Sequence, residues 1–207
     1  MIPLFKTYWD EADIEAVNAS IRRGMFWAEG PNIESFERAL SKYLDIPYVL
    51  VCNSGTSALH LAMIACGIKE GDEVIVPSFT FIATANCVKF VGAVPVFADI
   101  DENYLLSLVD IEKRITPRTK AIIWVRYAGL FYDVRELIKV AKRHNLLLIE
   151  DAAEGLPGVG HNGNCAILSF CQNKIIATGE GGAFVPSNES YYVRAKLARS
   201  HGWDNGT

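Results

Sequence analysis

The feature that most constrains this fold is a regular alternation of short apolar runs with amphipathic stretches from residue 47 to residue 201. The runs have strand length and are apolar throughout, as expected for strands buried on both faces. Such strands, separated by helices, predict an α/β fold, a mostly parallel sheet covered by helices on both faces. The expected strands are residues 47–53, 72–77, 93–100, 120–125, 146–151, 166–170 and 182–186, and the expected helices are 56–67, 83–92, 133–144 and 187–201.

Two helices are expected before the first strand. Ile14, Val17 and Ile21 share one face of the first, which ends near Gly24, and Pro31 begins the second. The 207 residues contain no low-complexity linker and no internal repeat. We therefore expect a single domain over residues 1–207, with residues 1–46 as an N-terminal helical segment that packs on it.

Charge, hydropathy and cysteine spacing exclude several classes of protein. The net charge of −4 disfavours nucleic acid as a partner. We expect a cytoplasmic protein without membrane contact, because no apolar run approaches the roughly 20 residues of a membrane span and the N-terminus does not resemble a signal peptide. The five cysteines are widely spaced and form no CxxC pair, which predicts reduced thiols and no metal site.

The segment NSGTSAL (53–59) follows a strand and opens a helix. Gly55 allows a tight turn, and the amides and hydroxyls of Thr56 and Ser57 could bind a phosphate at the helix N-terminus. The segment matches neither GxGxxG nor the P-loop pattern, which disfavours dinucleotides and nucleoside triphosphates. The alternative is a capped helix that binds nothing.

Two further strand ends carry reactive side chains. Asp151 ends an apolar strand, where it could pair with a cationic ring nitrogen, a metal or an arginine, or cap the next helix together with Glu154. Lys174 lies between apolar residues and the glycine-rich run 178–182. Burial lowers a lysine's pKa and so favours Schiff-base chemistry, although the residue could also be a surface lysine at a turn. A phosphate site, a carboxylate and a lysine together suit pyridoxal 5'-phosphate (PLP).

With these motifs the chain resembles the DegT-type sugar aminotransferases, a branch of the fold-type I PLP-dependent enzymes. The resemblance covers essentially the whole chain. It is carried by IPLFK (2–6), Gly30-Pro31, NSGTSAL, GDEVIVPSFTFIATAN (71–86), PVFADID (95–101), ITPRTKAI (115–122), IEDAAE (149–154), SFCQNK (169–174) and TGEGG (178–182).

The resemblance implies a role for each matched residue. Lys174 falls at the Schiff-base lysine, Asp151 at the partner of the pyridine nitrogen, and Glu154 beside the ring oxygen of the cofactor. Phe81 falls where an aromatic ring stacks on the pyridine. The positions that match phosphate-binding residues are Gly55, Thr56 and Ser169.

The implied reaction is a transamination in which glutamate donates an amino group to a nucleotide-linked keto sugar, carried out by a homodimer. Lys174 argues against the related sugar dehydratases, in which a histidine replaces it. Glu154 together with QNK (172–174) resembles perosamine-synthase-like members, whereas VRYAG (125–129) resembles the VHYAG of another subgroup. Arg126 stands at the usual histidine of that motif, so its role is open.

Two departures leave alternatives open. The connection 155–170 is shorter than is usual in the family, which could reshape the cofactor edge or the dimer contact, and we expect His161 to be a loop residue within it. The family continues past the position of Thr207 into a small C-terminal domain, so the resemblance implies a PLP-binding large domain with the small domain missing. A catalytically inactive remnant or regulatory binding module is the main alternative, and a nucleotide-binding α/β protein without PLP is another.

Overall fold

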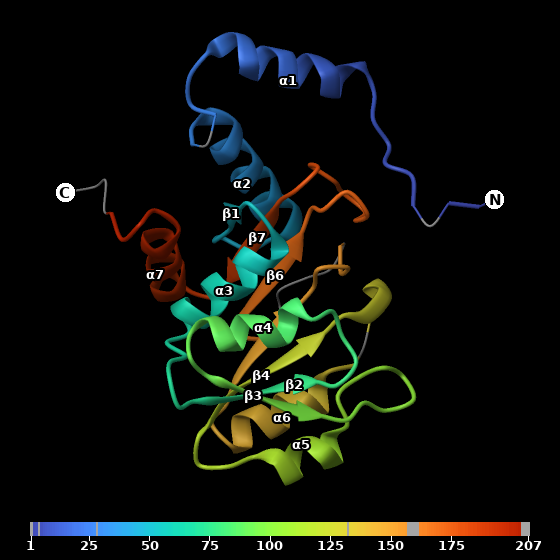
Figure 1. Ribbon diagram of the computed structural model, residues 1–207, viewed down its shortest axis with the longest axis vertical. Helices are drawn as coiled ribbons and strands as arrows, with labels where there is room; N and C mark the ends of the chain where they lie inside the picture. The colour runs from blue at the N-terminus through green and yellow to red at the C-terminus, as the bar shows by residue number, and fades with distance from the viewer. Residues whose placement is uncertain (1, 4, 28, 132, 157–161, 204–207) are drawn as a thin grey trace.

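A central sheet organises the chain in the computed structural model, which describes residues 2–3, 5–27, 29–131, 133–156 and 162–203 (Figure 1). His161 lies outside the described residues. Within them the strand order is β1-β7-β6-β5-β4-β2-β3. The strands are β1 (Leu50–Cys52), β2 (Glu73–Pro77), β3 (Val94–Ala98), β4 (Thr119–Val125), β5 (Leu147–Asp151), β6 (Cys165–Ser169) and β7 (Gly182–Pro186).

Helices cover both faces of this sheet, which confirms the expected α/β class (Figure 1). One face packs against α3 (Gly55–Ala65), α4 (Ala83–Phe90) and α7 (Glu189–Arg199). The other packs against α2 (Pro31–Leu44), α5 (Leu108–Arg114) and α6 (Arg135–Arg143). Strand β4 shows why the apolar runs do not alternate with polar residues. Ala121 and Ile123 enter the first core and Ile122 and Trp124 the opposite one, so four consecutive positions are buried.

The sheet is mostly parallel, as predicted, and β7 is the exception. Strands β3, β2, β4, β5 and β6 pair in parallel, whereas β7 runs antiparallel to both β6 and β1. Strand β1 therefore points the same way as β5 and β6, and all three end at one edge of the sheet. Because β7 returns beside β6, the connection 170–181, which contains Lys174, stays at that edge as well.

The two N-terminal helices differ in how they pack. Helix α1 (Glu11–Arg23) starts with a reciprocal capping pair between Asp10 and Asp13 and has no buried residue. Helix α2 begins at Pro31 and buries Leu40 and Leu44 against the sheet. In Figure 1, α1 lies away from the sheet, beyond α2.

Helix α5 was not predicted from the sequence. It is capped by Ser107, whose Oγ accepts from the amide of Asp110, and it buries only Ile111. One buried position does not establish a helical period. None of the described helices combines the length and the apolar character that a membrane span needs.

Gly182, on β7, lies against the backbone that opens α3. It pairs with Cys52 on β1 and with Ser169 on β6. A Cβ at this position would collide with the carbonyl oxygen of Ser54 and lie 2.6 Å from the amide nitrogen of Gly55. Both are backbone atoms, which cannot rotate aside as a side chain can.

We therefore expect Gly182→Ala to lower the free energy of unfolding by about 3 kcal/mol, the upper end for overpacking a tight site. Urea unfolding measures this change. The control is Gly71→Ala, at a glycine with φ of +85° and no atom within 4 Å of the added Cβ. That variant should lose only the left-handed penalty of about 1 kcal/mol. Equal losses in the two variants would contradict the prediction.

Candidate active site

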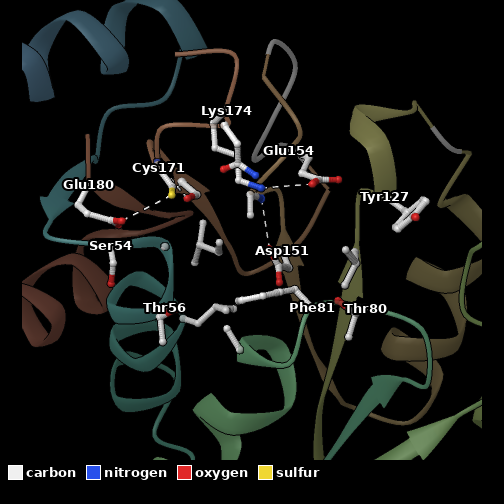
Figure 2. A pocket seen from close by; sticks show the side chains of 18 of the residues that line it. Ser54, Thr56, Thr80, Phe81, Tyr127, Asp151, Glu154, Cys171, Lys174 and Glu180 are labelled. Carbon is white, nitrogen blue, oxygen red and sulfur yellow. Dashed lines mark hydrogen bonds and ion pairs between the residues drawn. The ribbon is translucent and has the colours of Figure 1, made fainter. Parts of the chain in front are cut away.

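A cavity of about 610 Å³ opens where β1, β5 and β6 end (Figure 2). In this view Lys174 and Glu154 lie on one side of the cavity, Thr56 and Phe81 lie on the other, and Asp151 lies between them. The structure thus brings together most of the residues that the sequence proposed for a cofactor site, whereas Ser57 does not line the cavity because its amide donates to Ser54 Oγ inside the helix cap. The proposed residues that line the cavity are Gly55, Thr56, Phe81, Asp151, Glu154, Ser169 and Lys174.

The N-terminus of α3 faces this cavity. Ser54 is its N-cap, and Ser54 Oγ accepts from the amide of Ser57 at 3.0 Å. The amides of Gly55 and Thr56 have no partner among the described residues, so they can donate to a ligand. A Cβ on Gly55 would lie 2.8 Å from Ser169 Cβ, so only glycine lets Ser169 approach the helix start.

Asp151 is a buried carboxylate, 4% exposed, at the end of β5. Its Oδ2 accepts from Thr84 Oγ1 at 2.7 Å, and its Oδ1 accepts from the amide of Ala153 at 3.2 Å. Burial raises the pKa of Asp151, and these two donors, together with the charge of Lys174, partly oppose the rise. Thr84 gives its one hydroxyl hydrogen to Asp151, so Thr80 must donate to Thr84 across their 2.9 Å contact.

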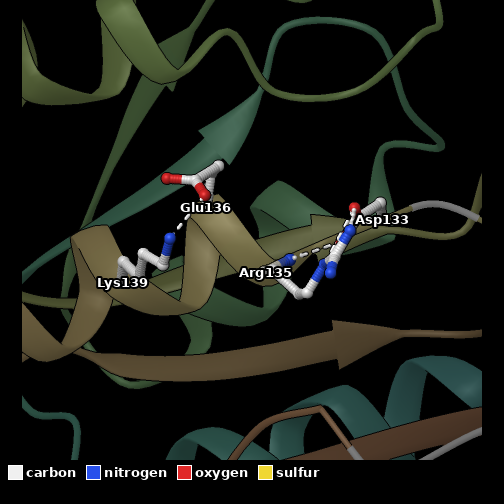
Figure 3. Close-up of polar contacts among 4 residues, drawn as sticks. All are labelled: Asp133, Arg135, Glu136 and Lys139. Carbon is white, nitrogen blue, oxygen red and sulfur yellow. Dashed lines mark hydrogen bonds and ion pairs between the residues drawn. The ribbon is translucent and has the colours of Figure 1, made fainter.

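Lys174 projects into the cavity and is not a surface lysine at a turn. Its side chain is 17% exposed, and its Nζ lies 3.2 Å from Glu154 Oε1. Figure 3 shows a chemically similar pair on α6, Lys139 with Glu136, at 2.7 Å. There both side chains are about two-thirds exposed. The difference in burial separates a cavity lysine from an ordinary surface ion pair.

Glu154 links the lysine to the turn after β4. Its Oε2 accepts from the amide of Ala128 at 2.9 Å, and Ala128 has a left-handed φ of 53°. Gly129 packs on the same residue, because a Cβ there would lie 2.6 Å from the carbonyl oxygen of Glu154. One carboxylate therefore positions both the amine of Lys174 and the backbone of this turn.

Arg126 is engaged inside the fold. Its side chain is 2% exposed, and its Nε and one terminal nitrogen both donate to Glu150 Oε1, at 2.9 and 2.5 Å. The guanidinium also lies 5.4 Å from the ring of Trp124 and 5.0 Å from that of Phe131. Sequence reasoning left the role of this residue open, and the structure places it in a buried ion pair.

Sequence reasoning missed several residues of the cavity. Thr80 and Thr84 stand four residues apart, a spacing that places them on one face of a helical turn and could have linked them. Cys171, whose Sγ lies 3.6 Å from Glu180 Oε1, gave no sequence signal. Phe79 and Tyr127 are aromatic lining residues that the strand pattern could not distinguish from core residues.

Comparison with known proteins identifies the family. The model of the DegT/DnrJ/EryC1/StrS aminotransferase family matches residues 7–207. The chain belongs to this family. The match confirms the resemblance that the motifs carried.

Two relatives in this aminotransferase family are GDP-perosamine synthases. The one from Caulobacter vibrioides is 46% identical over 84% of the chain and 49% of its own length. The one from Escherichia coli O157:H7 is 38% identical over 97% of the chain and 57% of its own length. The chain spans about half the length of these curated relatives.

Solved aminotransferase structures share the fold. The aminotransferase from Psychrobacter cryohalolentis matches with a TM-score of 0.91 at 32% identity, over 96% of this chain and 52% of that one. A putative sugar aminotransferase from Streptococcus pneumoniae, described as the PLP form, matches with a TM-score of 0.91 at 29% identity, over 99% and 59%. The family's solved structures thus include PLP-bound chains with this architecture.

The raised pKa of Asp151 predicts that its buried carboxylate destabilises the folded chain at neutral pH. The folded chain holds this proton more tightly than the unfolded chain, so stability is lost as the pH rises above the ordinary value of 3.8. Asp151→Asn keeps the shape and an acceptor for Thr84 but removes the charge. We expect its Tm at neutral pH to exceed that of the wild type by roughly 2–4 °C, with the difference shrinking toward pH 4.

The control is Asp133→Asn at the start of α6 (Figure 3). Hydrogen bonds from Arg135 lower the pKa of the exposed Asp133 to about 2, so its charge favours the folded state at neutral pH. This variant should therefore gain no stability. A Tm for Asp151→Asn below that of the wild type at neutral pH would refute the prediction.

Proposed function

We propose that this chain binds PLP and serves a transamination in which glutamate donates an amino group to a nucleotide-linked keto sugar. The observation that carries the proposal is that Lys174, the buried carboxylate of Asp151 and the open N-terminus of α3 line one cavity. Family membership supports it, as do solved relatives described as PLP and pyridoxamine-phosphate forms.

The residues at the start of α3 fit the cofactor's phosphate. The unpaired amides of Gly55 and Thr56 can donate to its oxygens, and the positive end of the helix dipole favours its charge. Ser169 Oγ accepts from the amide of Cys171 at 3.4 Å, which leaves its hydroxyl hydrogen to donate. The close contact of Gly55 with Ser169 brings these donors to one place.

Asp151 fits the cofactor's ring nitrogen. An isolated buried carboxylate is unfavourable, and a cationic partner within the cavity relieves that cost. Asp151 thereby holds a proton on the ring nitrogen, while Thr84 and Ala153 keep the carboxylate oriented. Phe81, which is 76% exposed and lines the cavity, would stack on the ring.

Lys174 carries the proton chemistry. PLP supplies a carbonyl that amines attack and a ring that takes up electrons. Lys174 Nζ would hold the cofactor in place, and as a free amine it would move a proton at the substrate carbon that bears the nitrogen. Glu154, 3.2 Å away, orients this amine and accepts a hydrogen bond from it.

We propose a GDP-linked keto sugar as the first acceptor to test, for the synthesis of an amino sugar used in polysaccharides. The reason is the identity with two GDP-perosamine synthases and with the spore coat polysaccharide biosynthesis protein SpsC from Bacillus subtilis, which is 36% identical. We further propose that the active form is a homodimer. Glutamate is the proposed donor.

Adding PLP to the purified chain should produce the visible absorbance band of lysine-bound PLP. Lys174→Ala should abolish this band, because Lys174 is the one lysine among the described residues that line the cavity. The matched control is Lys139→Ala, which removes the exposed lysine of the surface pair in Figure 3 and should leave the band unchanged. A wild-type chain without the band would refute PLP binding.

A second candidate function is a PLP-binding or regulatory module without catalysis. The chain spans only about half of the length of its curated relatives, and this observation is the reason to test a module without catalysis. Incubation with glutamate, PLP and a GDP-linked keto sugar separates the two functions. Formation of 2-oxoglutarate together with an amino sugar supports the aminotransferase, whereas a PLP band without transfer supports the module.

A further inference from the structure

Three aromatic rings contact one another beside the cavity. Their centroids are 5.1 Å apart for Phe79 and Tyr127, 5.3 Å for Tyr104 and Tyr127, and 5.6 Å for Phe79 and Tyr104. Phe79 and Tyr127 line the cavity. Phe79 and Tyr104 are nearly half exposed, at 45% and 48%. We call these three residues the aromatic cluster.

The cluster extends the cavity in one direction. Tyr127 follows β4, Phe79 follows β2 and Tyr104 follows β3, and these strands are neighbours in the order β5-β4-β2-β3. The rings therefore run from the position of Asp151, on β5, toward the edge strand β3. Ligands of parallel α/β sheets bind in loops at these strand ends, so the cluster lies where a large substrate would extend.

Two of the rings lie at or next to a residue with a left-handed backbone conformation. Tyr104 has a left-handed φ of 62°, rare for a bulky residue. Its loop is fixed by Asp101, whose Oδ1 accepts from the amides of Asn103 and Leu105 at 2.8 and 3.1 Å. Tyr127 precedes the left-handed Ala128, which Glu154 holds. Strain of this kind concentrates at ligand sites, where it orients a side chain.

We propose that the aromatic cluster binds the nucleobase of the nucleotide-linked substrate by stacking, while the sugar reaches Lys174 through the cavity. The proposal deepens the proposed function and rests on it for the identity of the substrate. The three side chains are planar and carry no formal charge, which suits the π-face of a base and not a diphosphate. Continuity between Phe79, Tyr127 and Lys174 in one cavity joins the base site to the reacting end.

Titration of the 207-residue chain with GDP tests the proposal without requiring PLP or turnover. Tyr104→Leu and Phe79→Leu should each weaken GDP binding about fivefold or more, the range for losing one base–aromatic stack. Tyr104→Phe keeps the ring and should stay within about twofold of the wild type. The control is Tyr43→Leu, which removes a tyrosine on α2 that is somewhat more exposed than Tyr104 (61% against 48%) and should have no effect.

Inorganic pyrophosphate and PLP serve as reporters of an intact site. Pyrophosphate lacks a base, so its affinity should be the same for Tyr104→Leu as for the wild type. The PLP band should also persist in that variant. Equal weakening of pyrophosphate binding and GDP binding in Tyr104→Leu would indicate a damaged fold and would overturn the assignment for Tyr104. The assignment of the cluster stands if Phe79→Leu weakens GDP binding and leaves pyrophosphate binding unchanged.

The proposal is overturned if the wild-type chain binds none of GDP, UDP and thymidine diphosphate, or if both leucine variants bind GDP as the wild type does. A change of oligomeric state in the leucine variants with unchanged GDP affinity would assign the cluster to a contact between copies of the chain. The same measurements distinguish failure of this proposal from failure of the proposed function. GDP binding that depends on Tyr104 in a chain without a PLP band supports the base site and refutes the cofactor.

Discussion

The contact of Gly182 with the backbone of Ser54 and Gly55 is the constraint on which the candidate site depends. It lets the antiparallel strand β7 lie so close to the turn that opens α3 that a side chain at position 182 would not fit between them. With β7 in that place, β1 and β6 are held on either side of it and end at the same edge as β5. The helix N-terminus, Ser169 and Asp151 therefore converge, although about 100 residues separate the first from the other two.

Electrostatics give this edge of the sheet its chemical character. Asp151 is buried beneath the cavity and receives hydrogen bonds from a hydroxyl and an amide, neither of which neutralises it. Lys174 lowers the pKa of Asp151 and Glu154 raises it, and Glu180 adds a third carboxylate to the described lining of the cavity. Such an arrangement favours a second positive charge in the interior, and it places the anion-binding helix terminus on a different wall. A ligand with a cationic ring and an anionic arm is complementary to both.

Much of this architecture could be predicted because strands that are buried on both faces have consecutive apolar residues, which are visible in the sequence. Gly55, Asp151 and Lys174 could be grouped because each follows an apolar run, and parallel strands end together. The direction of β7 could not be predicted, since a buried strand reads the same whether it runs parallel or antiparallel. Helix α5 carries only Ile111 in the core, which is too little for a periodic signal. The pairing of Arg126 with Glu150 and the left-handed backbone of Tyr104 depend on tertiary contacts that no local pattern contains.

The buried pair of Arg126 and Glu150 also limits how the sequence can evolve. Replacing Arg126 by the histidine that is usual in the family motif, without any other change, would leave the charge of Glu150 in the interior without its guanidinium. Removing one partner of such a pair typically costs about 3–5 kcal/mol, a large part of the stability of a folded domain. Gly155 adds to the constraint, because its backbone lies against the arginine side chain. A histidine at position 126 is therefore compatible with this fold only where position 150 changes first or at the same time.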